Sequence, residues 1–443
     1  MAYTNRKRNY PNEYASKSAH RNIIKDESVK KFLKECELPK KTKEIHIDLT
    51  KTIKLNEPEH NPIKNIIAID AGHQEIFIQK EFPSSQITFF QFGILNFKIT
   101  DLQELAVKKF IDPQDLSKIK QINPIKLVIP SKNLTLRNQG TLTNSVRKAI
   151  YDFFLQETEE KKLIDTLKWL LFNEYDHIDY GKYSINCPEC KSPISKPTLQ
   201  EMHFHNNTEC PKCSGTIYLT DLFGLHLKID DEIGAENIFA YLTSLIEQML
   251  IIHLIKAILK EDSSKMSETL FIRDGPLAFF GHTSIMTGPM RRLINFLYDN
   301  YDLKMVGLEK SGAFVDHANE IAQNLSPGTF ILLDDEYIYK YIIPNKFPLN
   351  YGRGQHYSNK IIFKTNFEKM YVASLPTRKF TTQPKKADFK NIEIILTNIQ
   401  QLKCEMYESA LLPIALINKL VSLSDHPSSS ILGKFVKTNM LNK

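Results

Sequence analysis

An α/β fold with a mixed sheet is predicted by the order of the segments along this 443-residue chain. A short continuous apolar run at residues 65–70 (NIIAID) is typical of a strand buried on both faces. Residues 75–82 and 86–99 follow as two further strands of a β-meander, with turn residues between them. After a long amphipathic helix at 238–260, strands and helices alternate. This order favours an α/β fold over a bundle or an all-β sandwich.

The later elements are predicted in the same way. Residues 101–228 are expected to form an insertion, mostly helical up to about residue 176, within a domain that spans 61–443. Strands are expected in the segments TLFIRDGPLAFF, KMVGLEK, FILLDD, KIIFKT and KMYVASLP, and helices at 290–299, from His317, at 392–404 and at 410–423.

The charge is unevenly placed. The net charge is +7, and residues 1–44 hold twelve Lys or Arg against six Asp or Glu. We predict a basic arm over residues 1–60, which either screens phosphates or is a solvated leader. No apolar run reaches the roughly 20 residues of a membrane span, and no apolar stretch follows the basic start, so a cytoplasmic protein without a membrane segment is expected.

Four cysteines have the spacing of a zinc ribbon. Cys187 and Cys190 form one CxxC pair, and Cys210 and Cys213 form a second after nineteen intervening residues. Four thiolates complete a tetrahedron with no open position, so the Zn²⁺ predicted here is structural. We place the ribbon at residues 183–222.

Other potential ligands near these cysteines are assigned ordinary roles. His203 and His205 lie between the two pairs and are expected at the surface, because four thiols already suffice. Cys36 and Cys404 are expected to be free, partly buried thiols.

Two aspartates occupy similar settings. Asp70 and Asp274 each follow a predicted buried strand and precede Ala-Gly or Gly. Taken singly, each favours a hairpin turn. If the strands are neighbours, however, the carboxylates converge where α/β folds place their sites, and a divalent cation would relieve their repulsion. Mg²⁺ or Mn²⁺ there can activate water and clamp phosphate oxygens.

A family resemblance connects these motifs. The order AIDAGH, a meander, a long helix with an acid, RDGPL, VGLEKSG, LLDDEYI and a Pro-containing C-terminal helix resembles the NurA nucleases. The resemblance implies an RNase H-like core, Mn²⁺- or Mg²⁺-dependent cleavage of DNA, a homodimer and a partner, the hexameric DNA-translocating ATPase HerA. It extends from about Lys64 to the C-terminus, with the cysteine region inserted.

The resemblance also assigns residues. It makes Asp70 and Asp274 the principal metal carboxylates. It adds a glutamate from the long helix, for which Glu247 is the first candidate and Glu236 the second. Lys310 matches a lysine that can contact the scissile phosphate. A solvated helix face for Glu247 and a surface position for Lys310 are the alternatives.

One part of the family pattern is missing. Its Tyr and His flanking a C-terminal proline correspond here to Ala410 and Asn418. Asn can ligate through its carbonyl oxygen but cannot act as an imidazole. His73 and His356 are the candidate substitutes, with hydrogen-bonded loop histidines as the alternative.

Two functions follow from this pattern. The first is a metal-dependent DNA nuclease, a phosphodiester hydrolase that works with a HerA-type ATPase in DNA end processing or antiviral defence. The second is a catalytically weak or inactive adaptor that keeps the fold and binds DNA for the ATPase. The aspartate pair favours the first, and the missing Tyr and His favour the second.

Overall fold

The computed structural model describes residues 17–36, 51–101, 120–158, 161–179, 183, 185–194, 196–343, 350–404, 411–423 and 428–441. The chain divides into two compact units, Met1–His46 and Ile47–Lys443. The predicted arm over residues 1–60 is therefore too long, because β1 (Thr52–Lys54) already pairs with a strand of the larger unit.

The N-terminal unit contains two short helices, α1 (Lys17–Lys25) and α2 (Glu27–Glu35). Asp26 caps α2 by accepting the backbone N–H groups of Ser28 and Val29, which would otherwise lack partners. The prediction of an exposed basic segment is consistent with this unit, because residues 20–36 include no buried side chain.

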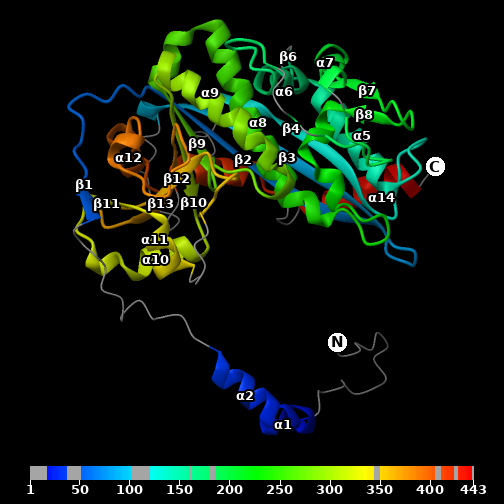
Figure 1. The fold of residues 1–443 in the computed structure, drawn as a ribbon, viewed down its shortest axis with the longest axis horizontal. Coiled ribbons are helices and arrows are strands. Elements are labelled where there is room, and N and C mark those ends of the chain that lie inside the picture. Colours follow the sequence, from blue (N-terminus) through cyan, green and yellow to red (C-terminus); the bar gives the residue numbers. More distant parts are fainter. Residues whose placement is uncertain are drawn as a thin grey trace. The chain divides into compact units, whose positions relative to one another are not determined.

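A nine-stranded sheet forms the centre of the larger unit (Figure 1). Its order is β1-β11-β12-β13-β10-β9-β2-β3-β4. The strands besides β1 are β2 (Asn65–Gln79), β3 (Ser85–Lys98), β4 (Lys120–Lys132), β9 (Thr269–Asp274), β10 (Lys304–Glu309), β11 (Thr329–Leu332), β12 (Ser358–Lys364) and β13 (Met370–Pro376). β9 pairs in parallel with β2 and with β10, and the other pairings of this sheet are antiparallel. The predicted mixed α/β sheet is confirmed.

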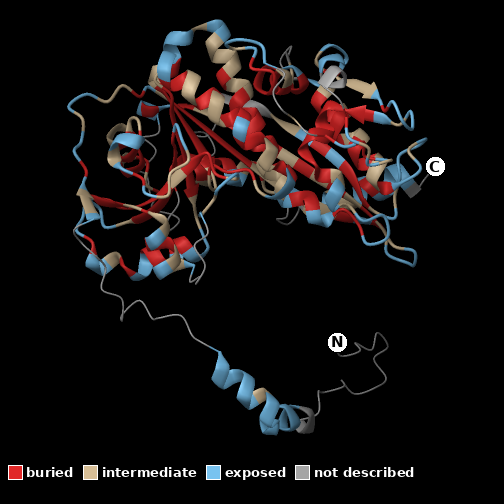
Figure 2. Cartoon of the chain, in the orientation of Figure 1, coloured by how far each residue is buried: buried red, intermediate tan, exposed pale blue. Residues whose placement is uncertain are grey.

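Helices cover both faces of this sheet, and the covered strands form its buried centre (Figure 2). On one face a large apolar core joins the strands to α5 (Leu142–Leu155), α6 (Leu163–Leu171), α8 (Phe239–Glu261) and α9 (Thr287–Asn300). On the other face a second core joins them to α12 (Ile392–Gln401) and α13 (Leu412–Val421).

Smaller elements complete the unit. Three further α-helices are α10 (Ala313–Glu320), α11 (Asp335–Tyr337) and α14 (Ser428–Leu441), the last of which lies against β2. Two small hairpins pair β5 (Glu157–Thr158) with β6 (Lys161–Lys162) and β7 (Asn207–Glu209) with β8 (Thr216–Tyr218). A further α-helix, α7 (Lys196–His205), belongs to the cysteine region. The short 3₁₀ helices are η3 (Leu219–Phe223), η4 (Leu225–Lys228), η5 (Glu236–Ile238), η6 (Ser263–Glu268), η7 (Gly281–Met286), η8 (Ala322–Asn324) and η10 (Lys386–Asp388), and η9 (Ile338–Ile342) is a π-helix.

Among the described helices α8 is the longest, and it is apolar on nearly all sides instead of amphipathic as predicted, because it is enclosed by its own protein. The segment Glu236–Glu261 is long and apolar enough to cross a membrane by length and composition, but 67% of its apolar window is buried within the fold. The prediction that no segment has this length was wrong, and burial explains the composition.

Two predicted boundaries need correction. Residues 65–70 and 75–82 do not form separate strands, because β2 continues through Gly72 and pairs with β3 along most of its length. Residues 101–228 are not wholly an insertion, because β4 is an edge strand of the main sheet. The residues after β4 contribute α5, α6 and part of the cysteine region to the large apolar core.

Candidate metal site and cysteine cluster

Asp70 and Asp274 stand side by side. The parallel pairing of β2 with β9 places Ile69 opposite Arg273, so the next residue of each strand is one of the two aspartates. Neighbouring strands lie about 4.8 Å apart. Asp274 is the last residue of β9 as predicted, whereas Asp70 lies within β2, at the point where the pairing with β9 stops.

Strand periodicity puts the two carboxylates on one face. Ile66 and Ala68, then Asp70, alternate along β2 toward α12 and α13, and Leu270 and Ile272 precede Asp274 in the same way on β9. On β10, Val306 and Leu308 precede Lys310 in the same alternation. Three parallel strands therefore bring two acids and one lysine to the same corner of the sheet.

Asp70 is buried beside a second negative charge. Its side chain is 6% exposed, and its carboxylate accepts the backbone N–H of Ala71 at 2.8 Å. Burial, and then repulsion from Asp274, raise the pKa of Asp70 to about 7, against the opposing effect of Lys310. A divalent cation bound by both carboxylates would neutralise this repulsion. Mg²⁺ and Mn²⁺ prefer oxygen ligands of this kind, so the residues present fit either ion.

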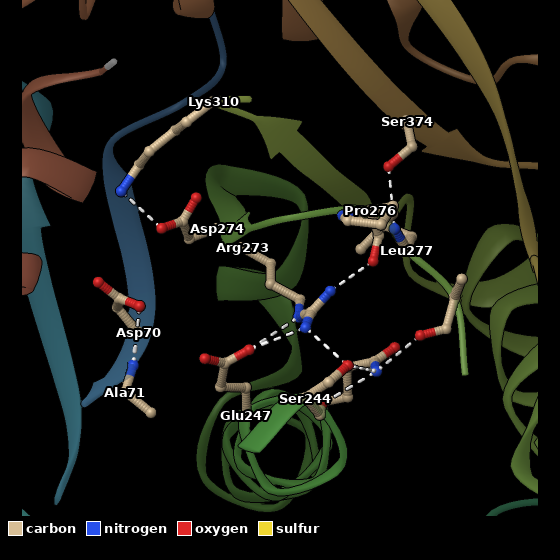
Figure 3. A network of polar contacts seen from close by, with 12 residues as sticks. Asp70, Ala71, Ser244, Glu247, Arg273, Asp274, Pro276, Leu277, Lys310 and Ser374 are labelled. Atoms are coloured by element: carbon tan, nitrogen blue, oxygen red, sulfur yellow. Dashed lines mark hydrogen bonds and ion pairs between the residues drawn. The ribbon is translucent and has the colours of Figure 1, made fainter. Parts of the chain in front are cut away.

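Lys310 is ion-paired with Asp274 in this structure. Its Nζ lies 2.5 Å from Asp274 Oδ2, and the side chains of Lys310 and Asp274 are 26% and 22% exposed. Figure 3 shows Lys310 reaching down to Asp274, with Asp70 nearby on β2. The lysine predicted from the resemblance is therefore at the aspartate pair and not elsewhere on the surface.

Glu247 lies at the same site but is held by an arginine. It projects from α8 on the other face of the sheet, is 4% exposed, and receives Arg273 Nη2 and Nε at 2.8 and 3.2 Å (Figure 3). Burial raises the pKa of Glu247 to about 8, Arg273 opposes the rise, and Asp70 and Asp274 add to it. The three carboxylates therefore share one electrostatic environment, while the nearest partner of Glu247 is a guanidinium.

Arg273 is the residue that motif analysis missed. It also donates to Ser244 Oγ at 2.8 Å and to the carbonyl of Pro276, which joins α8 to the turn after Asp274. Gln248, the next residue of α8, continues this buried network by accepting from Tyr357 at 2.7 Å. The available signal was an arginine inside a continuous apolar strand, a position that requires a buried partner.

The end of helix α13 packs closely against β2 and β3 beside Asp70. Asp70 is opposite Gly93 on β3, and a Cβ at Gly93 would lie 2.6 Å from a methyl group of Val421. A Cβ at Gly72 would lie 2.4 Å from the Val421 carbonyl oxygen, so both glycines are required for this close approach. Asn418 is exposed on α13, and Ala410 lies outside the described residues.

The substitute ligands are placed elsewhere. The His73 ring packs against Phe90 and Phe239, with centroids 5.5 and 5.6 Å away. His356 is 4% exposed, and its burial lowers its pKa to about 3, with Lys360 and Arg291 adding to the shift. Glu236 is exposed in η5, and its charge raises the pKa of Glu75 in addition to the larger effect of burial. In the described part of the chain, neither histidine contacts Asp70 or Asp274 in a recorded interaction.

The four cysteines form a closed cluster. Their sulfur atoms all lie within 4.8 Å of one another, and Cys187–Cys213 and Cys190–Cys210 are each 3.6 Å apart. A tetrahedral ion with sulfur ligands at 2.3 Å would space them by about 3.8 Å. The cluster can therefore hold a metal ion, and among the described residues it is the group of three or more His, Cys, Asp or Glu that meets this spacing.

Each CxxC turn has the same backbone pattern. The amide after each pair returns to the carbonyl of its first cysteine, from Lys191 to Cys187 at 3.0 Å and from Ser214 to Cys210 at 2.9 Å. Lys191 and Ser214 also share a positive φ of about 60°. Cys187 and Cys210 belong to the large apolar core, so the cluster is built into the domain and does not project from it.

The remaining candidates are not part of this cluster. His203 Nε2 lies 2.7 Å from Glu174 Oε1, the His203 ring packs at a tilt against Phe172, and His205 is exposed. The surface position predicted for His205 is confirmed, whereas the His203 side chain is only 12% exposed, because its ring packs against Phe172. Cys36 and Cys404 are free thiols, the first exposed and the second buried.

The chain has weak similarity to solved structures of NurA nucleases. The structure of the NurA nuclease from Sulfolobus solfataricus gives a TM-score of 0.37 at 10% identity over 97% of this chain and 98% of that chain. NurA with manganese gives 0.33 at 11% identity over 96% and 98%, and a third NurA structure gives 0.30 at 11% over 97% and 99%. No family model and no curated protein matches this chain. The similar structures belong to the family that the motifs resemble.

Proposed function

We propose that this protein is a metal-dependent deoxyribonuclease. The observation that carries the proposal is the pairing of Asp70 with Asp274 at one level of two parallel strands. Two carboxylates this close, one of them buried, repel each other, and a divalent cation bound by both would relieve that repulsion. Mg²⁺ or Mn²⁺ bound there would supply an activated water and charge stabilisation for phosphodiester hydrolysis.

The side chains divide the work between them. Asp70 and Asp274 would hold the ion, and Lys310 is within reach of a phosphate bound beside Asp274. Arg273 fixes Glu247 and the turn after Asp274, so it acts as a positioning residue. We keep Glu247 as a candidate ligand that would have to share its carboxylate between Arg273 and the ion.

Cleavage of end-labelled linear DNA tests this proposal. We expect cleavage in Mn²⁺ or Mg²⁺, none in EDTA, and a loss of at least about 100-fold in Asp274→Asn protein, because one of the carboxylates facing the ion is removed. The matched control is Glu320→Gln, at an exposed glutamate at the end of α10, and it should cleave DNA as wild type does. Equal cleavage by wild type and Asp274→Asn would contradict the assignment.

An adaptor without catalysis is the second candidate. Asn418 on α13 cannot replace an imidazole, and Glu247 is engaged by Arg273. This alternative expects salt-dependent DNA binding with no cleavage under any divalent ion. The same assay, run beside a DNA-binding titration, separates the two functions.

Partners and location rest on the motif resemblance. We propose a HerA-type hexameric ATPase as the partner, a homodimer as the assembly, and the cytoplasm as the site of action, in DNA end processing or antiviral defence. For the cysteine cluster we propose structural Zn²⁺, since four thiolates leave no open position for catalysis.

A further inference from the structure

We propose that Lys310 is a built-in counter-ion, which occupies the charge position of the divalent ion until that ion displaces it. This inference rests on the proposed metal site and concerns how the site is kept ready for the ion. The observation behind it is the contact of Lys310 Nζ with Asp274 Oδ2 at 2.5 Å, beside a buried Asp70.

The charges of the corner explain why a counter-ion is needed. Asp70 and Asp274 face the same side, and the repulsion between them opposes folding unless a positive charge lies close. Arg273 is on the other face and is committed to Glu247, Ser244 and Pro276. In the described part of the chain, the ion pair on this face of the aspartate pair is made by Lys310.

Displacement follows from the geometry. Lys310 comes directly after β10, and its ammonium ends a flexible four-carbon stem, so it can swing away without moving the sheet. A divalent ion bound by Asp274 would repel the ammonium at close range. Lys310 therefore competes with the metal, and removing its charge should strengthen metal binding.

The test compares Lys310→Met with wild type in two measurements without DNA. In a Mn²⁺ titration followed by electron paramagnetic resonance, we expect binding about tenfold tighter in the variant. In thermal unfolding, we expect a lower midpoint than wild type in EDTA and a larger upward shift on adding Mn²⁺. A purely structural lysine would lower the midpoint in both conditions and leave Mn²⁺ affinity unchanged.

Two controls separate the charge from other effects. Lys310→Arg keeps the charge and should bind Mn²⁺ as wild type does. Lys64→Met removes a lysine whose Nζ lies 2.5 Å from Glu268, just before the opposite ends of β2 and β9, and should also leave Mn²⁺ affinity unchanged.

The outcomes distinguish this inference from the proposed function. If wild type binds Mn²⁺ and Lys310→Met binds it equally or more weakly, the counter-ion role is wrong and the metal site stands. If wild type, Lys310→Met and Asp70→Asn all fail to bind Mn²⁺, the metal site is wrong and the counter-ion role with it.

Discussion

At the scale of single residues, Asp70 should destabilise the metal-free protein at neutral and higher pH. Its folded-state pKa is raised to about 7, so the folded protein holds this proton more tightly than the unfolded chain does. The penalty is absent below the ordinary pKa of 3.8, grows as pH rises from about 4 to 7, and is complete above that. A shift of this size corresponds to at most about 4 kcal/mol.

Asp70→Asn should therefore stabilise the protein in EDTA. We expect urea unfolding to give the variant a larger free energy of unfolding than wild type at pH 8, with the difference shrinking toward pH 5. Saturating Mn²⁺ should reverse the order, since only wild type keeps the ligand. A variant that is less stable than wild type at pH 8 in EDTA would contradict the position assigned to Asp70.

Glu247 shares the raised pKa of Asp70 but differs from it in having a buried partner. Its carboxylate is the partner of a buried guanidinium, so Glu247→Leu leaves Arg273 unpaired and should destabilise the protein by about 3–5 kcal/mol. The double variant Glu247→Leu/Arg273→Met should recover part of that loss. Denaturant unfolding of the three variants measures it, and a loss below about 1 kcal/mol in the single variant would rule out the ion pair.

At the scale of elements, the sequence predicted most helices and strands but not where Asp70 lies along its strand. Ala71-Gly72 has the composition of a turn, yet β2 runs straight through it. The glycine is there because α13 crosses close above, a contact between segments about 350 residues apart that no local pattern reveals. The convergence of Asp70 and Asp274, by contrast, requires only that their strands are parallel neighbours, which they are.

The cysteine cluster is an element whose geometry was predicted from the sequence. The spacing alone indicated four thiols around one ion, and the structure brings all four sulfur atoms together. Its burial in the main core was not predictable from spacing, because it depends on packing against distant helices.

We expect about one zinc per chain, and the variant Cys187→Ser should lose the metal and have a lower thermal midpoint. Cys36→Ser, at an exposed thiol, should change neither quantity, and elemental analysis with thermal unfolding measures both.

At the scale of the whole molecule, the N-terminal unit should be dispensable for folding. It is compact by itself, and residues 1–44 carry most of the excess positive charge. Deleting residues 1–46 should leave the thermal midpoint and Mn²⁺ affinity unchanged. If the arm screens phosphates, DNA binding should weaken and its salt dependence should become shallower. An unchanged salt dependence would identify the arm as a solvated leader.

The central claim is that Asp70 and Asp274 bind one catalytic divalent ion, and a crystal soaked in Mn²⁺ tests it most directly. The account predicts an anomalous peak between the two carboxylates, with the Lys310 ammonium moved away from Asp274. Crystals of Asp274→Asn protein should lose that peak. A wild-type crystal with no manganese between Asp70 and Asp274, under conditions in which the protein cleaves DNA, would contradict the account.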